Sequence, residues 1–210
     1  MPEVRTRKEN NLHHAAFWEI TESEEALKNG LALSPEALNR LSCRKSEVHR
    51  KGYLAIRQLL KQMNIVPKTH QYDVLGAPYL TDGRFLSLSH TKTFAAVALS
   101  DTPVGIDIEN YQDKIIRIAP RFLHSTEVPA QITSETVPFL TQIWTAKEAI
   151  YKALRIPGVH FSEQIEIHPF EVGASKGSAC VYLNERTKEF HLHFLYFKNF
   201  CATIASFKNP

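Results

Sequence analysis

The chain has 210 residues, of which 43% are hydrophobic and 22% are charged. These proportions predict a globular protein with one domain or two small ones, and no apolar run approaches the length of a membrane span. A formal net charge of +3 predicts a mildly basic surface, which suits anionic ligands or an acidic protein partner without identifying either.

The cysteines and the N-terminal residues predict a cellular location. Three cysteines, Cys43, Cys180 and Cys201, are too few and too scattered for a disulfide framework. The first sixteen residues carry basic side chains but no apolar segment of the kind found in signal peptides. We therefore expect a cytoplasmic protein that is not attached to a membrane.

The N-terminal half predicts helices followed by short strands. Ser34 and Pro35 are typical of a helix start, because serine caps the first turn and proline is tolerated at the first helical position. A short apolar run over residues 85–88 leads to Ser89 and His90. The hydroxyl and imidazole of these two residues are groups that bind phosphate oxygens well.

An internal repeat indicates how the halves are related. Residues 53–65 align without gaps on residues 144–156, and residues 94–100 align on residues 200–206. Two matches in the same order favour duplication over chance. We therefore predict an α+β fold, a pseudo-dimer of two similar halves that each pack a long helix on a small antiparallel sheet. The boundary is expected near Asp101-Thr102-Pro103, which gives domains 1–102 and 103–210.

The segment Val104–Asn110 is predicted to be a strand that carries two carboxylates on one face. Asp107 and Glu109 are two positions apart, so they point the same way, while Ile106 and Ile108 point into apolar packing. On its own, such a pair is more often a solvated sheet face.

A helix predicted over residues 143–152 adds a third carboxylate and an ammonium group. Glu148 and Lys152 lie at i and i+4 and share a face, an arrangement that is usually an ordinary surface ion pair. Together with Asp107 and Glu109, they form a set suited to a Mg²⁺ ion that holds a polyphosphate.

The motifs in this order resemble the 4′-phosphopantetheinyl transferase superfamily. They are Gly76-Ala77-Pro78, Leu88-Ser89-His90, Gly105 to Glu109, and Trp144 to Lys152. The chain is similar to the larger, internally duplicated type, which activates surfactin synthetase and other peptide, polyketide and fatty-acid synthases. Several motifs in order are far more specific than any one of them.

The resemblance implies a reaction and a set of site residues. Such an enzyme transfers 4′-phosphopantetheine from coenzyme A to a serine of an acyl or peptidyl carrier protein and releases adenosine 3′,5′-bisphosphate. It implies a Mg²⁺ site at Asp107, Glu109 and Glu148, with Lys152 neutralising the pyrophosphate. It also implies that Arg44, Arg50, Ser89, His90, Asp107 and Lys152 bind coenzyme A, and that the active site lies between the halves.

The general base that deprotonates the serine is left open between two carboxylates. Glu148 is close to the implied metal, and Glu127 lies in Arg121–Glu127, which resembles the family's R-F-F-x-x-x-E segment. His124 is a further candidate. Arg117, Arg121, Phe122 and Leu123 are candidate contacts for an acidic carrier protein.

One residue departs from the family pattern, and two other functions compete. Ala77 replaces the lysine common in the family, which removes a basic contact to coenzyme A.

A non-catalytic scaffold that binds a nucleotide or carrier is the main alternative, although it would not need the three carboxylates and Lys152. Nucleic-acid binding is disfavoured because no basic stripe with interleaved aromatic residues is present. We expect a monomer with no nucleic-acid or membrane partner.

Overall fold

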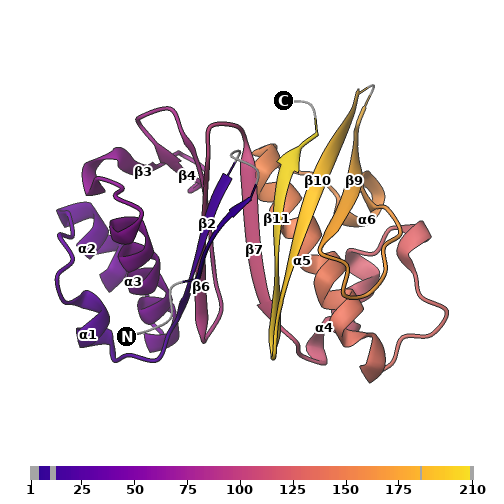
Figure 1. Ribbon diagram of the computed structural model, residues 1–210, viewed down its shortest axis with the longest axis horizontal. Coiled ribbons are helices and arrows are strands. Elements are labelled where there is room, and N and C mark those ends of the chain that lie inside the picture. The colour runs from indigo at the N-terminus through magenta and orange to yellow at the C-terminus, as the bar shows by residue number, and fades with distance from the viewer. Residues whose placement is uncertain (1–4, 10–12, 185, 209–210) are drawn as a thin grey trace. The chain divides into compact units, whose positions relative to one another are not determined.

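A computed structural model of the chain describes residues 5–9, 13–184 and 186–208 (Figure 1). They form two compact units, Met1–Asp101 and Thr102–Pro210. The basic N-terminal segment falls partly on residues 1–4 and 10–12, which lie outside the described residues. Within the described ranges, no helix combines the length and the apolar character needed to cross a membrane.

The helices of the N-terminal unit begin at serine caps. The helices are α1 (Glu24–Lys28), α2 (Pro35–Ser42) and α3 (Glu47–Gln62), and their N-caps are Ser23, Ser34 and Ser46. Each cap side chain accepts a hydrogen bond from a backbone N–H of the first turn, which satisfies a group that has no partner inside the helix. The predicted start at Ser34 and Pro35 is therefore found in the structure.

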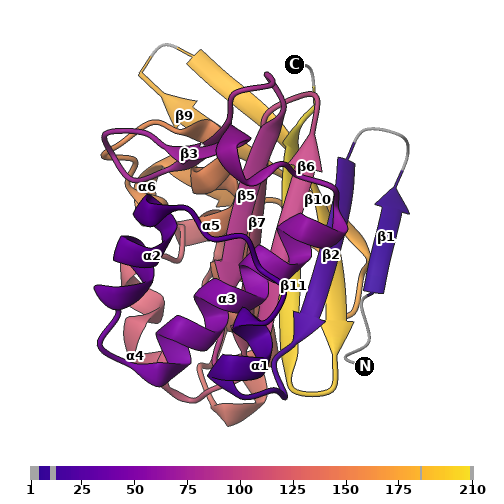
Figure 2. The same ribbon diagram turned by 90° about the vertical axis from the view of Figure 1, so that its left-hand side faces the viewer.

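The sheet of the N-terminal unit is antiparallel and has the order β1-β2-β6-β5. Its strands are β1 (Arg5–Glu9), β2 (His13–Glu19), β5 (Phe85–His90) and β6 (Phe94–Ser100). A short turn, η1 (Pro67–Thr69), leads into the hairpin of β3 (His70–Tyr72) and β4 (Pro78–Leu80). Figure 2 shows α3 lying across one face of this sheet. Leu54 and Leu59 of α3 are fully buried with Ala95 and Val97 of β6.

The C-terminal unit begins with a strand and one long helix. Strand β7 (Val104–Asn110) is followed by α4 (Lys114–Ile118) and the short turns η2 (Ala119–Arg121), η3 (Ser125–Glu127) and η4 (Ser134–Thr136). Helix α5 (Val137–Leu154) and the short α6 (Phe161–Gln164) come next. The strands β8 (Ile165–Ile167), β9 (Lys176–Leu183), β10 (Arg186–Phe197) and β11 (Phe200–Phe207) complete the unit.

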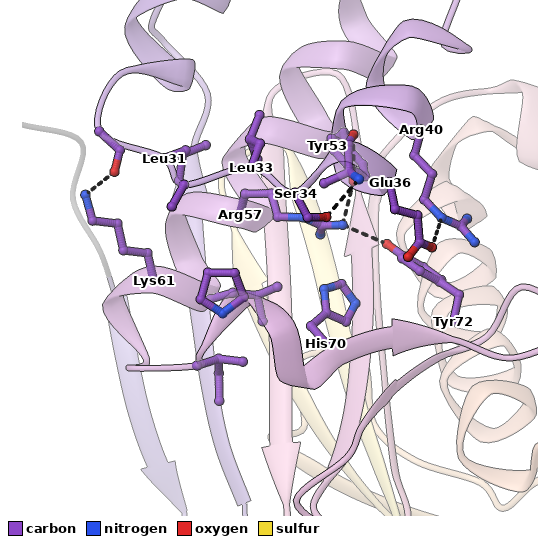
Figure 3. A pocket seen from close by; sticks show the side chains of 16 residues that line it. Leu31, Leu33, Ser34, Glu36, Arg40, Tyr53, Arg57, Lys61, His70 and Tyr72 are labelled. Atoms are coloured by element: carbon purple, nitrogen blue, oxygen red, sulfur yellow. Dashed lines mark hydrogen bonds and ion pairs between the residues drawn. The ribbon is translucent and has the colours of Figure 1, made fainter.

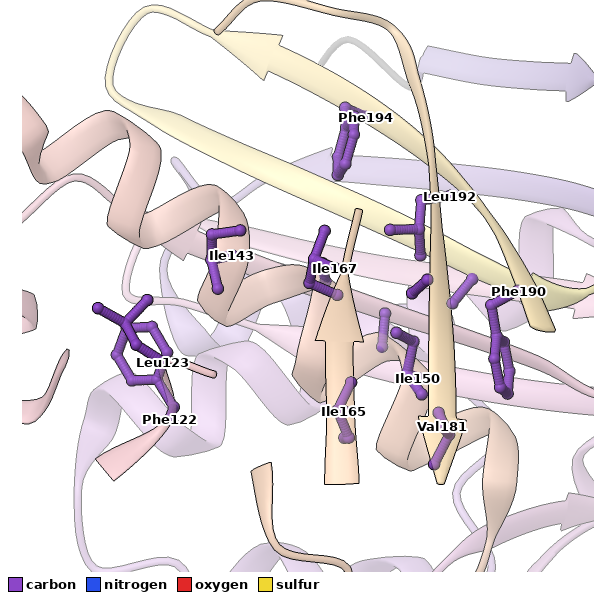
Figure 4. Packing of buried hydrophobic residues seen from close by; sticks show 14 of the residues in the cluster. Phe122, Leu123, Ile143, Ile150, Ile165, Ile167, Val181, Phe190, Leu192 and Phe194 are labelled. Atoms are coloured by element: carbon purple, nitrogen blue, oxygen red, sulfur yellow. The ribbon is translucent and has the colours of Figure 1, made fainter. Parts of the chain in front are cut away.

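These strands form an antiparallel sheet in the order β7-β11-β10-β9-β8, with α5 packed on β7 and β11. Figure 4 shows part of the core between them, where Ile143 and Ile150 of α5 lie near Phe190, Leu192 and Phe194 of β10. All five side chains are at most 2% exposed. Removal of this much apolar surface from water is the main stabilising contribution to the unit.

Strand β7 and helix α5 approach each other unusually closely at Gly105. A Cβ atom added to Gly105 would lie 1.8 Å from the carbonyl oxygen of Ala149. Only a residue without a side chain fits there, so the glycine sets how closely the two elements pack.

The predicted α+β class is confirmed. Each unit contains a long helix on an antiparallel sheet, and the predicted strands at residues 94–100, 104–110 and 200–206 are β6, β7 and most of β11. The strands of the C-terminal sheet include one that is longer than the short strands expected from the sequence, since β10 spans 12 residues.

Candidate active site

Strand β7 and helix α5 bring together the acidic residues that the sequence singles out in the C-terminal unit. Asp107 lies opposite Thr203 of β11, and Glu109 lies opposite Cys201, so the two carboxylates share one face of the sheet. Ile106 and Ile108 alternate with them and are buried. Helix α5 packs on β7 and carries Glu148 and Lys152.

Lys152 forms an ion pair with Asp107. Its Nζ lies 2.7 Å from Asp107 Oδ1 and also donates a hydrogen bond of 3.1 Å to the carbonyl oxygen of Ile106. Asp107 is only 5% exposed, so its charge is poorly compensated by water and depends on nearby groups. The ammonium group of α5 is therefore directed at the acidic strand.

The other two carboxylates are in an environment that disfavours their charged forms. Burial is the main cause that raises the pKa of Glu148 to about 7, and repulsion from Asp107 and Glu109 adds to it. Attraction by Lys152 opposes the rise. Burial and then the Asp107 charge also raise the pKa of Glu109, while Lys114, a hydrogen bond with Trp144, and Lys152 oppose the rise. Three acidic groups thus interact electrostatically, and they carry more negative charge than Lys152 neutralises.

This donor set fits a hard divalent cation by its chemistry. Carboxylate oxygens are the ligands that Mg²⁺ prefers. An added cation would offset both causes of the raised glutamate pKa values, burial first and then repulsion from Asp107. Among the described residues, however, no group of three His, Cys, Asp or Glu side chains is already arranged to hold a metal ion. The side chains of Asp107, Glu109 and Glu148 would have to draw together to enclose one.

Glu127 has a different environment from these carboxylates. It is 6% exposed and forms an ion pair of 2.8 Å with Lys147, whose side chain is fully buried. Its oxygens also accept hydrogen bonds from the backbone N–H groups of His124, at 2.8 Å, and Ile167, at 2.7 Å. Because these partners occupy both oxygens of Glu127, the geometry favours a structural ion pair over a general base. Its catalytic role stays a prediction.

Lys147 completes this buried pair. Its Nζ donates hydrogen bonds to the carbonyl oxygens of Phe161, at 2.9 Å, and Ile165, at 2.6 Å, in addition to its contact with Glu127. Burial lowers the pKa of Lys147, and Glu127 opposes that shift. In the structure, Lys147 therefore joins α5 to residues 161–165.

Two of the candidate carrier contacts were wrong. Phe122 is fully buried with its ring centroid 5.1 Å from that of Trp144, and Leu123 is 7% exposed. Both belong to the core in Figure 4 and are not available to a partner protein. Arg117 and Arg121 are exposed, so only these two of the four are surface residues.

The predicted coenzyme A residues of the N-terminal unit include two arginines with internal contacts. Arg50 Nε lies 2.8 Å from Glu24 Oε2, and its Nη1 donates to the carbonyl oxygens of Arg44 and Lys45 at 3.1 Å each. Arg44 donates to the carbonyl oxygen of Arg40 and stacks over Tyr53, with its Cζ atom 4.1 Å from the ring centroid. Both guanidinium groups therefore help to hold α1, α2 and α3 together.

Ser89 and His90 lie at the end of β5 and are partly buried. A Cβ added to Gly52 of α3 would lie 2.8 Å from the His90 ring, so the glycine makes room for that imidazole. His49 of α3 has its ring centroid 6.1 Å from that of His90. The structure thus brings His90 beside the N-terminal half of α3, which also carries Arg50.

Sequence reasoning missed the polar contacts behind the acidic strand. Thr145 Oγ1 of α5 lies 2.8 Å from Thr203 Oγ1 and 3.9 Å from Cys201 Sγ, and all three residues are buried. Thr203 and Cys201 are the cross-strand neighbours of Asp107 and Glu109. The only signal in the sequence is the alternation of Cys201 and Thr203 within the last strand, which does not by itself indicate a partner on α5.

Comparison with known proteins agrees with the motifs. Residues 103–205 match the model of the 4′-phosphopantetheinyl transferase superfamily. The chain is 31% identical over 112 residues to the 4′-phosphopantetheinyl transferase gsp of Aneurinibacillus migulanus. The aligned region covers 49% of this chain and 46% of that relative. It is 29% identical over 135 residues to the 4′-phosphopantetheinyl transferase Sfp of Bacillus subtilis strain 168, covering 57% and 59%.

A third relative, a 4′-phosphopantetheinyl transferase of Bacillus subtilis, is 31% identical over 101 residues, which covers 43% of this chain and 45% of the relative. The chain spans about half the length of the curated relatives it matches. The matched family segment contains Asp107, Glu109, Glu127, Glu148 and Lys152. The resemblance predicted from the motifs is confirmed: residues 103–205 match the 4′-phosphopantetheinyl transferase superfamily, and the similar curated proteins are 4′-phosphopantetheinyl transferases.

Proposed function

We propose that the protein transfers 4′-phosphopantetheine from coenzyme A to a serine hydroxyl of an acyl or peptidyl carrier protein. The observation that carries this proposal is the interacting set of Asp107, Glu109, Glu148 and Lys152, which lies inside the segment matched by the superfamily model. In the reaction, the serine oxygen forms a bond to the β-phosphorus of coenzyme A, and the bond from that phosphorus to the bridging oxygen breaks. Adenosine 3′,5′-bisphosphate leaves with the bond electrons.

We propose Asp107, Glu109 and Glu148 as the residues that would hold Mg²⁺. The bound cation would supply charge neutralisation for the pyrophosphate and for the leaving group. The raised pKa values of Glu109 and Glu148 support this assignment, since burial and then the charge of Asp107 disfavour their charged forms more than Lys152 favours them. A carboxylate site without such raised pKa values would gain less from a cation.

Lys152 is proposed to bind the pyrophosphate oxygens. Its Nζ is already directed at the acidic face, 2.7 Å from Asp107, and the side chain is 27% exposed, so it can reach an anionic ligand. A positive charge placed at the phosphates stabilises the negative charge that develops in the transition state. If Lys152 served only as an ion pair with Asp107, its loss would affect stability and not transfer.

Glu148 is proposed as the general base in preference to Glu127. Without a cation, burial and then the Asp107 charge raise the pKa of Glu148 to about 7, close to the working pH that suits a base. As the base it would hold Mg²⁺ through a water molecule, because direct ligation to a cation would lower that pKa. Glu148 would accept the serine proton as the new bond forms. Glu127, by contrast, already accepts hydrogen bonds from Lys147, His124 and Ile167.

The remaining parts of the proposal concern the N-terminal unit and the partners. We propose that the two units are duplicated halves of a pseudo-dimer, with the active site between residues 1–102 and 103–210. Arg44, Arg50, Ser89 and His90 would hold the phosphates of coenzyme A. The two arginines have internal contacts, so they would exchange or share them with the ligand. The enzyme would act as a cytoplasmic monomer on an acidic carrier protein.

One experiment tests the proposed activity. The protein is incubated with coenzyme A, Mg²⁺ and a panel of apo acyl and peptidyl carrier proteins, and the carriers are then weighed by mass spectrometry. We expect a carrier to gain the mass of phosphopantetheine, and we expect the gain to disappear when EDTA replaces Mg²⁺. No mass gain on any carrier would favour a non-catalytic binding protein.

Matched variants test the residue roles in the same assay. Lys152→Met and Asp107→Asn should each reduce the rate at least about a hundredfold, because the first removes the positive charge that binds the phosphates and the second removes a carboxylate that would hold Mg²⁺. Lys176→Met and Asp113→Asn change the same residue types at exposed positions of the same unit and should leave the rate unchanged. Equal rates for the two members of either pair would contradict the proposed site.

A further inference from the structure

A separate cavity lies within the N-terminal unit (Figure 3). Its volume is about 280 Å³, and its walls come from the loop before α2, from α2 and α3, and from η1 and β3. The apolar part of the wall includes Leu31, Leu33, Leu60 and Ile65. The carboxylates and lysine of the candidate active site are not among its lining residues.

Arg57 of α3 contributes a guanidinium group to this cavity that is only partly paired. Its Nη2 donates hydrogen bonds to the hydroxyl oxygens of Tyr53, at 2.7 Å, and Tyr72, at 3.2 Å. Its Nη1 is buried and has no hydrogen-bond partner among the described residues. Within the same residues, no carboxylate forms an ion pair with Arg57, whereas the nearby Arg40 is paired with Glu36 at 3.2 Å. The cavity wall therefore carries a positive charge without a counter-ion.

His70, at the start of β3, provides a second buried nitrogen. In the described part of the chain its Nε2 also has no hydrogen-bond partner. Burial, and then the charges of Arg57 and Arg40, lower the pKa of His70 to about 3, so the ring is neutral at physiological pH. A neutral imidazole can carry its proton on Nε2 and donate it. Figure 3 shows the Arg57 and His70 side chains entering the same space from α3 and β3.

The size and chemistry of the cavity indicate what it would hold. An apolar cavity of about 150 Å³ is enough for a benzene molecule, so the present one has room for a ring or short branched chain together with a small polar group. The half-buried Arg57 guanidinium, with its buried Nη1, favours an anion, because a poorly solvated charge without a counter-ion is costly. Two donors match the two oxygens of a carboxylate, while a phosphate dianion would leave oxygens without donors.

We propose that this cavity is a binding site for a small carboxylate with an apolar aromatic or branched body. Its oxygens accept hydrogen bonds from Arg57 Nη1 and His70 Nε2, and its apolar body packs against Leu31, Leu33, Leu60 and Ile65. The proposal concerns the N-terminal unit alone and does not depend on the transferase activity.

The test uses sodium benzoate as the probe and the full chain labelled with ¹⁵N. Benzoate should shift the backbone amide signals of residues 30–37 and 57–72, with a Kd on the order of 1 mM or tighter. Benzyl alcohol, which has the same ring but no charge, and inorganic phosphate should bind at least about tenfold more weakly. Equal binding of benzyl alcohol or phosphate, or no binding of benzoate, would overturn the proposal.

Variants locate the binding site. Arg57→Leu should weaken benzoate binding about tenfold to a hundredfold, which is the usual effect of losing a hydrogen bond to a charged group. Arg84→Leu is the matched control, since Arg84 lies in the same unit and pairs with Asp82 at the surface. Ala37→Leu fills the cavity without removing Arg57 and should also weaken binding, so the test holds even if Arg57→Leu fails to fold. Unchanged affinity in Ala37→Leu would place the ligand elsewhere and overturn the proposal.

Discussion

The buried ion pair between Lys147 and Glu127 leads to a prediction that separates a structural role from a catalytic one. Lys147→Met removes a fully buried ammonium group that donates to Glu127 and to the carbonyl oxygens of Phe161 and Ile165. It leaves the Glu127 carboxylate buried with only two backbone N–H donors. Breaking one side of a buried pair costs about 3–5 kcal/mol, which is a large part of the stability of a small domain.

The assay can report on the C-terminal unit alone because each unit contains one tryptophan. Trp18 lies on β2 and Trp144 on α5, and the chain has two tryptophans in total. In a Trp18→Phe background, urea unfolding followed by fluorescence reports on Trp144. Lys147→Met should lower the free energy of unfolding by about 3–5 kcal/mol. Lys208→Met removes an exposed ion pair of 2.6 Å with Glu189 in the same unit and should leave the free energy of unfolding nearly unchanged, because water screens exposed charges.

The companion variant addresses Glu127 directly. Glu127→Gln should also destabilise the unit, and combining it with Lys147→Met should cost less than the sum of the two single losses, because both changes remove one interaction. A loss below about 1 kcal/mol for Lys147→Met would refute the buried pair. If Glu127→Gln kept full stability but abolished carrier modification, the structural reading would be wrong and Glu127 would be the catalytic base.

Three further predictions concern Glu148, Gly105 and Arg121. Folding raises the pKa of Glu148 from an ordinary value of 4.5 to about 7, so its contribution to stability is fully present below pH 4.5 and is lost as pH rises through 7. The urea midpoint of the protein, measured in EDTA from pH 5 to 8, should therefore fall with rising pH. Glu148→Gln should make that fall smaller. Gly105→Ala should destabilise the C-terminal unit by more than about 3 kcal/mol in urea titrations, because the new methyl group meets main-chain atoms, and a smaller loss would show that α5 can move away easily. Arg121→Glu should raise the KM for an acidic carrier protein in steady-state transfer assays while leaving coenzyme A binding intact, and equal loss of both would discredit docking at this exposed residue.

Local patterns in the sequence were enough to predict the elements that carry the acidic cluster. The alternation in Val104–Asn110 predicted β7 and the face shared by Asp107 and Glu109, because a strand has a fixed period of two. The repeat predicted helical segments within α3 and α5, although α3 begins at Glu47, six positions before the first residue of the aligned segment. The start was missed because the repeat covers only the part of the helix that resembles α5.

Contacts between distant segments could not be predicted in the same way. Glu127 looked like a candidate base because of its motif, and its burial depends on Lys147 and on the N–H of Ile167, which lies 40 residues further along the chain. Phe122 and Leu123 were predicted to contact a partner because an irregular stretch has no helix or strand period that separates its buried apolar residues from its exposed ones. The cavity beside Arg57 has lining residues from 30 to 72, and no motif connects them.

The close approach at Gly105 has a consequence for how the acidic cluster responds to sequence change. Where residue 105 would carry a side chain, the carbonyl oxygen of Ala149 is present instead, so strand and helix touch through their peptide groups. Peptide groups are the same whatever amino acids surround them. Replacements among the apolar residues on the far side of α5 can therefore accumulate with little effect on the spacing between Asp107 on the strand and Glu148 or Lys152 on the helix, provided that residue 105 remains glycine.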